Sequence, residues 1–257
     1  MSGIGAVGGV STSYSPYSTI ASGGALQSAA QDASGLAIEE RTETQTRALD
    51  QGTQNLGDAR SALNIEDGAL EGINDYLQSI KELAIQAKND LLGDEERGYI
   101  QNQINQYMQG INDLANGTTF NEQHLLDGSR GNMTVASDGS GSTANVSTYD
   151  STVASLGIAN FDVTSGNFNL DDIDKAMDTV ASMRSNTGAE TNRVDHAMNY
   201  NTKASLELNG FAMDREEDRS INAVGELKKQ QALDQYQIML QKKQQEDRAA
   251  QSKIFFA

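Results

Sequence analysis

The fold is decided by one stretch, RALDQGTQNLGDARSALNIEDGALEGINDYLQSIKELAIQAKND, which covers residues 47–90. Leucine recurs at every seventh residue in it, at Leu49, Leu56, Leu63, Leu70 and Leu77, and Ala84 continues the series. The residues three positions after several members of this series are also apolar, namely Ala59, Ile73, Ile80 and Ala87. This two-position heptad pattern is typical of a coiled-coil helix. We therefore predict a long helix over residues 42–90 with a continuous apolar seam.

Four glycines lie within this predicted helix, at Gly52, Gly57, Gly68 and Gly72. A glycine in a helix interior costs about 1 kcal/mol relative to alanine. We therefore expect them to serve packing, for example by letting another helix approach closely. A break in the helix between Asn64 and Gly68 is the alternative.

A second helix is expected to follow the Gly93-Asp94 pair. Asp94 can cap it, and Glu95 and Glu96 suit the positive end of the helix dipole. The pattern predicts that this helix runs to about Ala115, because an Asn-Gly pair follows and stops it.

Residues 119–166 change character and are dominated by Ser, Thr, Gly, Asn and Asp. Short alternating runs at Met133–Ala136 and Val146–Tyr149 predict β-hairpins and loops. We expect this region to be the outward-facing and variable part of the chain.

Helical patterns return at 170–213, where a weaker seam has Ile173, Val180, Thr187 and Val194 seven residues apart. This helix can close an antiparallel bundle with the first, and Gly210 is expected to interrupt it. A last helical stretch is predicted at 215–252, with an apolar side that includes Leu233, Tyr236 and Leu240.

These patterns predict a mainly α fold, an elongated antiparallel coiled-coil helical bundle with a small β-hairpin and loop insertion at its distal end. Aromatic residues make up only 5% of the chain, which favours a thin bundle over a round domain with a deep core. The expected parts are a flexible Gly/Ser-rich tail, N-terminal rod helices, a β-hairpin region, a C-terminal rod helix and a terminal helix, at 1–24, 25–118, 119–167, 168–214 and 215–257.

The composition argues against several classes of function. The net charge of −17 disfavours non-specific binding to nucleic acid, which needs a basic face. There is no Cys, and His124 and His196 are the two histidines, so we predict no catalytic residue, no metal site and no cofactor. No stretch approaches the roughly 18 apolar residues of a membrane span. The N-terminal sequence does not resemble a secretory signal, so export would use another route.

Charge is unevenly distributed, because residues 228–257 hold six Lys or Arg against three Asp or Glu. A basic tail on an acidic body can pack against other copies of the chain. A solvated helix with a chance excess of charge is the other interpretation.

Several motifs resemble the bacterial flagellin family. DASGLAIEER (32–41), the EDGAL run (66–70) and KELAIQAKND (81–90) are similar to its N-terminal conserved region. ANGTTFNEQHLLDGS (115–129) resembles the family's turn into its first hairpin, and LDDIDKAMDTVASMRSNTGAETNRVDHAMN (170–199) its C-terminal segment. The resemblance covers about residues 22–130 and 168–240.

This resemblance implies a structural subunit of the flagellar filament that polymerises helically with other flagellin subunits, works outside the cell and is not an enzyme. It implies export through the flagellar type III channel, and an export chaperone as a partner. Leu233, Tyr236 and Leu240 would then pack in the terminal helix or against that chaperone.

The resemblance also singles out Leu83 and Gln86, which match positions that lie between subunits and are recognised by a Toll-like receptor. Ser79 and Gly110 stand where the family usually has Arg and Glu. Receptor binding depends on a few large anchors, so we expect weak or no receptor activation. Alternatively, Leu83 serves helix packing alone.

The chain departs from the family at both ends. The residues before the match are Gly/Ser-rich and contain Pro16, so we expect them not to form the family's N-terminal inner-tube helix. The terminal helix carries charged pairs such as Lys228-Lys229 and Lys242-Lys243. The alternative function is therefore a non-polymerising flagellin-like accessory protein, a minor or junction component that binds other flagellins or the chaperone.

Overall fold

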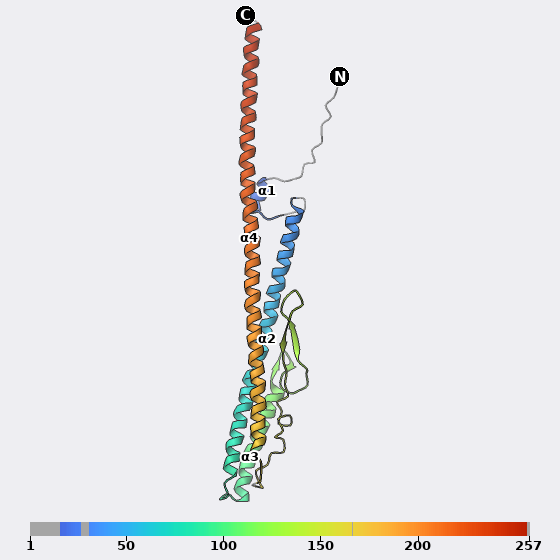
Figure 1. The fold of residues 1–257 in the computed structure, drawn as a ribbon, viewed down its shortest axis with the longest axis vertical. Helices are drawn as coiled ribbons and strands as arrows, with labels where there is room; N and C mark the ends of the chain where they lie inside the picture. Colours follow the sequence, from blue (N-terminus) through green and yellow to red (C-terminus); the bar gives the residue numbers. More distant parts are fainter. Residues whose placement is uncertain (1–15, 27–30, 166, 256–257) are drawn as a thin grey trace. The chain divides into compact units, whose positions relative to one another are not determined.

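The computed structural model describes residues 16–26, 31–165 and 167–255, with the backbone alone for 249–255. The chain divides into two compact units. Unit 1 draws on residues 1–46 and 205–257, and unit 2 is formed by 47–204. Helices α2 (Ala33–Ala87) and α4 (Asp171–Phe255) contribute to both units (Figure 1). The predicted mainly α class is confirmed, and the units cut across the predicted parts because these two helices are so long.

Unit 2 is an antiparallel bundle of residues 47–87 of α2, helix α3 (Asp94–Gly117) and residues 171–204 of α4. Ion pairs fix the register of α2 against α4. They show that the two helices are antiparallel, because a higher residue number on α2 is paired with a lower residue number on α4. The pairs are Lys81–Asp174 at 2.5 Å, Arg184–Asp67 at 3.0 Å and Arg60–Asp195 at 3.2 Å.

Helix α2 passes through 64–68 without interruption, so the alternative of a break there is wrong. It also begins at Ala33, earlier than the predicted residue 42. The reason is Asp32, whose Oδ1 accepts hydrogen bonds from the Gly35 amide and the Ser34 hydroxyl, both at 2.9 Å. A carboxylate that accepts from the first helical turn is a strong N-cap.

The four glycines at positions 52, 57, 68 and 72 of α2 divide into two pairs. A Cβ on Gly52 would lie 2.0 Å from the Ser137 carbonyl oxygen, and a Cβ on Gly72 would lie 3.0 Å from Leu114. Gly57 and Gly68 have open space around them. The expected packing role therefore holds for two of the four positions.

Helix α3 begins differently from the prediction. Gly93 occupies the N-cap with an extended backbone, and no side chain caps the helix. The expectation that Asp94 is the cap is therefore wrong, because Asp94 is already the first helical residue. Asp94, Glu95 and Glu96 do fill the first turn, where negative charge is favourable.

Two small hairpins follow α3. Strands β1 (Thr119–Phe120) and β2 (Gln123–His124) are joined by Asn121 and Glu122, both with positive φ. Two consecutive positive φ angles are typical of the type I′ hairpin turn.

The second hairpin pairs β3 (Met133–Ala136) antiparallel with β4 (Thr143–Val146). The predicted strand at Met133–Ala136 is confirmed. The predicted strand at 146–149 is wrong, because β4 ends at Val146 and the chain then turns towards the loop after β2. There the Tyr149 amide donates to the Leu125 carbonyl at 3.0 Å.

In unit 1, residues 16–24 are ordered, so the prediction of a flexible tail is wrong for them, while 1–15 lie outside the described residues. Pro16 starts the short helix α1 (Pro16–Ala21), as a proline can at the first helical position. Gly24 has φ of 92° and lies against the Glu216 backbone of α4. The Arg219 side chain donates to the Gly24 carbonyl at 2.6 Å and forms an ion pair with Glu39.

Helix α4 is continuous through Gly210, so the predicted interruption is wrong. A single glycine costs about 1 kcal/mol, and hydrogen bonds on both sides keep the helix intact.

Candidate functional site

The predicted rod seam lies mostly inside unit 2. Its buried members are at most 1% exposed and belong to one hydrophobic core, namely Leu56, Leu63, Leu70, Leu77, Ile173, Val180 and Val194. Leu49, at the start of the series, is half-buried. The seven buried side chains hold the bundle of one subunit together.

Two polar residues interrupt this apolar core. Glu66 on α2 and Thr187 on α4 are both 0% exposed, and the Thr187 hydroxyl donates to Glu66 Oε1 at 3.1 Å. Among the described residues, no group hydrogen-bonds the other carboxyl oxygen, Oε2. We did not predict Glu66 as a site residue, yet a signal was present. It lies three residues after Leu63, at a companion position that holds Ala59 and Ile73 in the neighbouring heptads.

A second buried carboxylate, that of Glu190, lies on α4 about one helical turn after Thr187. Glu190 is 6% exposed, and its two oxygens accept from the Ser147 amide at 2.8 Å and the Ser147 hydroxyl at 2.6 Å. Arg193 approaches it at 3.7 Å. Glu190 therefore attaches the segment after β4 to the helical bundle.

Burial is the main cause that raises the pKa of Glu66, from 4.5 to about 8. The nearby Glu190 and Asp67 carboxylates raise this pKa as well, while the hydrogen bond from Thr187 lowers it. Burial also raises the pKa of Tyr149, and the charges of Glu66 and Glu190 act in the same direction. Glu66 is therefore mostly neutral at pH 7.

The second hairpin is attached to the bundle through the carbonyls that end β3. The side-chain amide of Asn201, 2% exposed, donates to the Ser137 carbonyl at 2.6 Å. The Asn55 amide donates to the Ala136 carbonyl at 3.1 Å. Gly52 makes this approach possible, because any side chain there would meet the Ser137 carbonyl.

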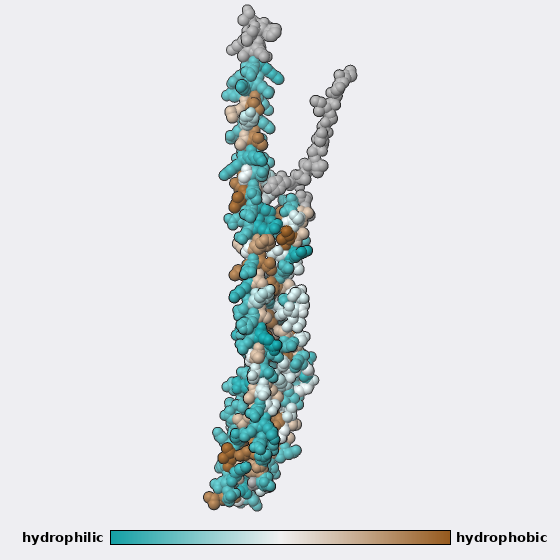
Figure 2. Space-filling model, in the orientation of Figure 1, coloured by the Kyte–Doolittle hydropathy of each residue, from teal (hydrophilic) through white to brown (hydrophobic). Residues whose placement is uncertain are grey.

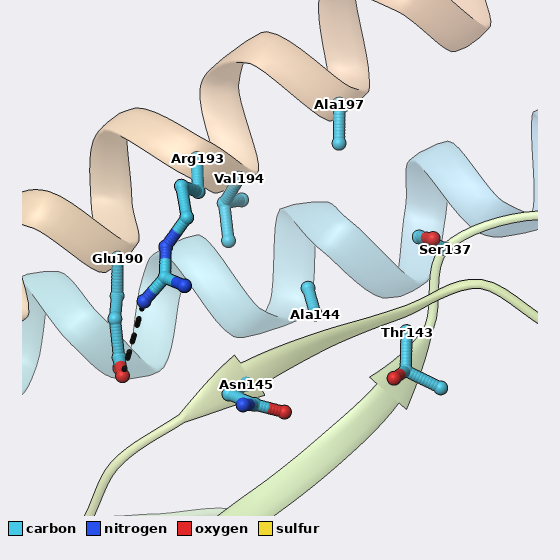
Figure 3. A pocket seen from close by; sticks show the side chains of 8 residues that line it. All are labelled: Ser137, Thr143, Ala144, Asn145, Glu190, Arg193, Val194 and Ala197. Carbon is cyan, nitrogen blue, oxygen red and sulfur yellow. Dashed lines mark ion pairs between the residues drawn. The ribbon is translucent and has the colours of Figure 1, made fainter.

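A small pocket of about 120 Å³ lies between this hairpin and α4 (Figure 3). Arg193 and Glu190 form one side of it in the figure, and the other lining residues are Ser137, Thr143, Ala144, Asn145, Val194 and Ala197. The lining has no histidine to act as a base for Ser137. We assign no function to this gap.

Leu83 and Gln86 occupy different environments near the end of α2. Leu83 is half-buried and packs against the core, whereas Gln86 is exposed. On α3, a Cβ at Gly110 would lie 2.9 Å from the Tyr76 ring. A glutamate at position 110 would therefore require Tyr76 to move.

The last part of α4 is unusually apolar for a solvated helix. Leu233, Tyr236 and Leu240 are 54%, 58% and 42% exposed, and Ile238 and Met239 are each 65% exposed. Figure 2 shows brown hydrophobic patches along this part of the helix among hydrophilic residues. We call residues 233–240 the terminal apolar patch.

The described residues contain no group of three or more His, Asp or Glu side chains that could hold a metal ion. No helix among them is long and apolar enough to cross a membrane. His124 Nδ1 lies 2.9 Å from the Asn116 carbonyl, in a local contact near the first hairpin.

Comparison with known proteins gives these features a context. Residues 15–131 match the bacterial flagellin N-terminal helical region. The chain is 37% identical over 147 residues to a flagellin of Clostridium tyrobutyricum, covering 57% of this chain and 38% of that protein. It is 31% identical over 195 residues to a flagellar filament core protein of Brachyspira hyodysenteriae, covering 68% of each.

Among solved structures, the chain resembles the crystal structure of Bacillus cereus flagellin, with a TM-score of 0.53 and 25% identity. That match covers 58% of this chain and 88% of the other. The helical bundle and the sequence relatives agree, and the chain therefore belongs to the bacterial flagellin family, the structural proteins of the extracellular flagellar filament.

Proposed function

We propose that this chain is a filament subunit that joins other flagellin subunits through the terminal apolar patch. The observation that carries the proposal is the exposure of five large apolar side chains within residues 233–240. Exposed apolar patches on soluble proteins mark interaction sites. Burying such side chains against a neighbour contributes about 25 cal/mol per Å² of apolar surface.

The distribution of charge supports the same proposal. Six basic residues against three acidic ones occupy residues 228–257, in a chain with net charge −17. Electrostatic complementarity between a basic helix and the acidic surface of another copy would favour association. Because each contact joins two different surfaces, such an assembly can extend as an open helical polymer.

The test replaces Leu233, Tyr236 and Leu240 together by serine and measures incorporation into sheared filament seeds by sedimentation. Leu91→Ser serves as the matched control, since Leu91 is 91% exposed but lies in the turn between α2 and α3. We expect the triple variant to stay in the supernatant and the control to sediment with the seeds. Equal incorporation of both variants would contradict the proposed role of the patch.

The same patch would be the surface that an export chaperone covers before assembly. A chaperone that protects the patch should bind the parent chain and the Leu91→Ser control equally well. It should not bind the triple serine variant. Equal binding of all three chains by the purified chaperone would exclude this role.

We also infer weak activation of the Toll-like receptor. Leu83 is half-buried, and Gly110 lies beneath Tyr76, so neither position offers a large free anchor. A reporter-cell assay should give a much weaker response than a strongly activating flagellin. Equal potency would show that Leu83 and Gln86 suffice without the usual Arg and Glu.

A further inference from the structure

We propose that Glu66, Tyr149 and Glu190 form a proton-controlled lock, which holds residues 147–149 against the helical bundle while Glu66 is neutral and loosens them when Glu66 ionises. The lock lies entirely within unit 2. It connects α2, α4 and the segment that leads out of the second hairpin.

Glu66 is the buried acid of this lock. Its side chain is fully buried in the apolar core, with one oxygen hydrogen-bonded to Thr187 at 3.1 Å. Among the described residues, Glu66 Oε2 and the buried Tyr149 hydroxyl have no hydrogen-bond partner. A buried polar atom without a partner is costly, and an ionised one costs far more.

The arginines around this carboxyl are paired with other acids. On α2, Asp67 is paired with Arg184 at 3.0 Å, and Arg184 also reaches Glu71 at 3.5 Å. On α4, Glu190 is paired with Arg193 at 3.7 Å, and further along Asp195 is paired with Arg60 at 3.2 Å. These three arginines already have acidic partners, so an ionised Glu66 would add an uncompensated negative charge.

Ionisation of Glu66 acts on the segment after β4 and not on the helices. The helices at this point are held by the apolar seam and by the ion pairs of Arg184 and Arg60. Residues 147–149 lie outside the helices, and Glu190 on α4 holds the Ser147 amide and hydroxyl at 2.8 and 2.6 Å. Backbone hydrogen bonds of Tyr149 with Leu125 and Gly128 attach the same segment to the loop after β2, so the contact that can yield is the one between Ser147 and Glu190. Moving this segment outward would admit water to Glu66 and relieve the repulsion between Glu66 and Glu190.

The direction of the effect follows from linkage. The raised pKa of Glu66, about 8 against an ordinary 4.5, means that the closed form holds a proton that the open form releases. The closed form is therefore fully favoured below pH 4.5, and its advantage is lost as pH rises towards 8. The ratio of open to closed forms should rise about tenfold per pH unit between pH 5 and pH 8, and level off above that.

The experiment measures hydrogen exchange of residues 147–151 in the full-length monomer from pH 5 to pH 9, with rates corrected for intrinsic exchange. Three chains are compared: the parent, Glu66→Gln and Asp58→Asn. Asp58 is an exposed carboxyl on the same helix, so it controls for the loss of one acid. In parallel, the carboxyl ¹³C resonance of Glu66 is titrated by NMR in the parent chain, which needs no substitution.

We expect protection of residues 147–151 to fall with pH in the parent and in Asp58→Asn. In Glu66→Gln it should vary less than twofold, because the amide cannot ionise. The Glu66 resonance should titrate near pH 8. Titration near pH 4.5, or the same pH dependence in the parent and Glu66→Gln, would overturn the proposal.

Discussion

At the scale of single residues, unit 2 depends on a few positions where backbone or polar groups are enclosed by other atoms. Gly52 and Asn201 together allow the Ser137 carbonyl to lie against α2 while keeping a hydrogen-bond donor. Glu66 and Thr187 place a carboxyl and a hydroxyl where the heptad pattern calls for apolar side chains. Substitution of these residues should affect the hairpin region more than the rest of the bundle.

Two glycine-to-alanine substitutions, each of which adds a single carbon atom, test whether the hairpin is held against α2. Gly52→Ala places a Cβ 2.0 Å from the Ser137 carbonyl oxygen and should destabilise the protein by about 1–3 kcal/mol, as overpacking does. Gly57→Ala meets no atom within 4 Å and should stabilise α2 by about 0.5–1 kcal/mol. Chemical denaturation of both variants is the measurement. A stabilising Gly52→Ala would mean that the hairpin is not held against α2.

The apolar seam of unit 2 could be predicted from the sequence, but its buried polar contacts could not. The seven-residue period in the sequence predicts the buried leucines Leu56, Leu63, Leu70 and Leu77. Glu66 breaks the period, and nothing in its spacing shows that Thr187, more than 100 residues later, donates to it. Likewise, Asn201 and Ser137 become partners only after the hairpin folds back on α4.

At the scale of elements, periodicity was a reliable guide to helices and a poor guide to their ends. The long α2 helix was predicted, but its start depends on the hydrogen bonds of Asp32 and its passage through 64–68 on packing. In α4, Gly210 and its neighbours are helical because one glycine weakens a long helix without ending it. The strand predicted beyond Val146 failed because that segment's hydrogen bonds go to the loop after β2.

The weight of the seam can be measured by truncating one leucine. Leu70 is 0% exposed, and Leu70→Ala should destabilise unit 2 by about 2–5 kcal/mol through lost burial and the cavity that remains. Leu91→Ala removes the same atoms from a side chain that is 91% exposed, and should change stability by about 0.5 kcal/mol or less. Thermal unfolding of both variants is the measurement. Equal effects of the two substitutions would contradict the assignment of the core.

At the scale of the whole molecule, the chain combines a well-packed unit 2 with a terminal helix that still exposes large apolar side chains. Unit 2 buries its apolar seam and pairs its hairpin anchors internally, with Glu66 Oε2 and the Tyr149 hydroxyl as unpaired exceptions among its described residues. By contrast, the terminal apolar patch has Tyr236 and Met239 58% and 65% exposed. This contrast is what a subunit needs if it folds alone and completes its packing in an assembly.

The most direct test of this account is seeded elongation. The purified full-length chain is mixed with short sheared flagellar filaments, and the filament lengths are measured by electron microscopy. We expect the seeds to lengthen and the added protein to have residues 233–240 buried between subunits. Seeds that keep their length, with the chain left in solution or only coating their surface, would contradict it and indicate an accessory protein that binds flagellins without polymerising.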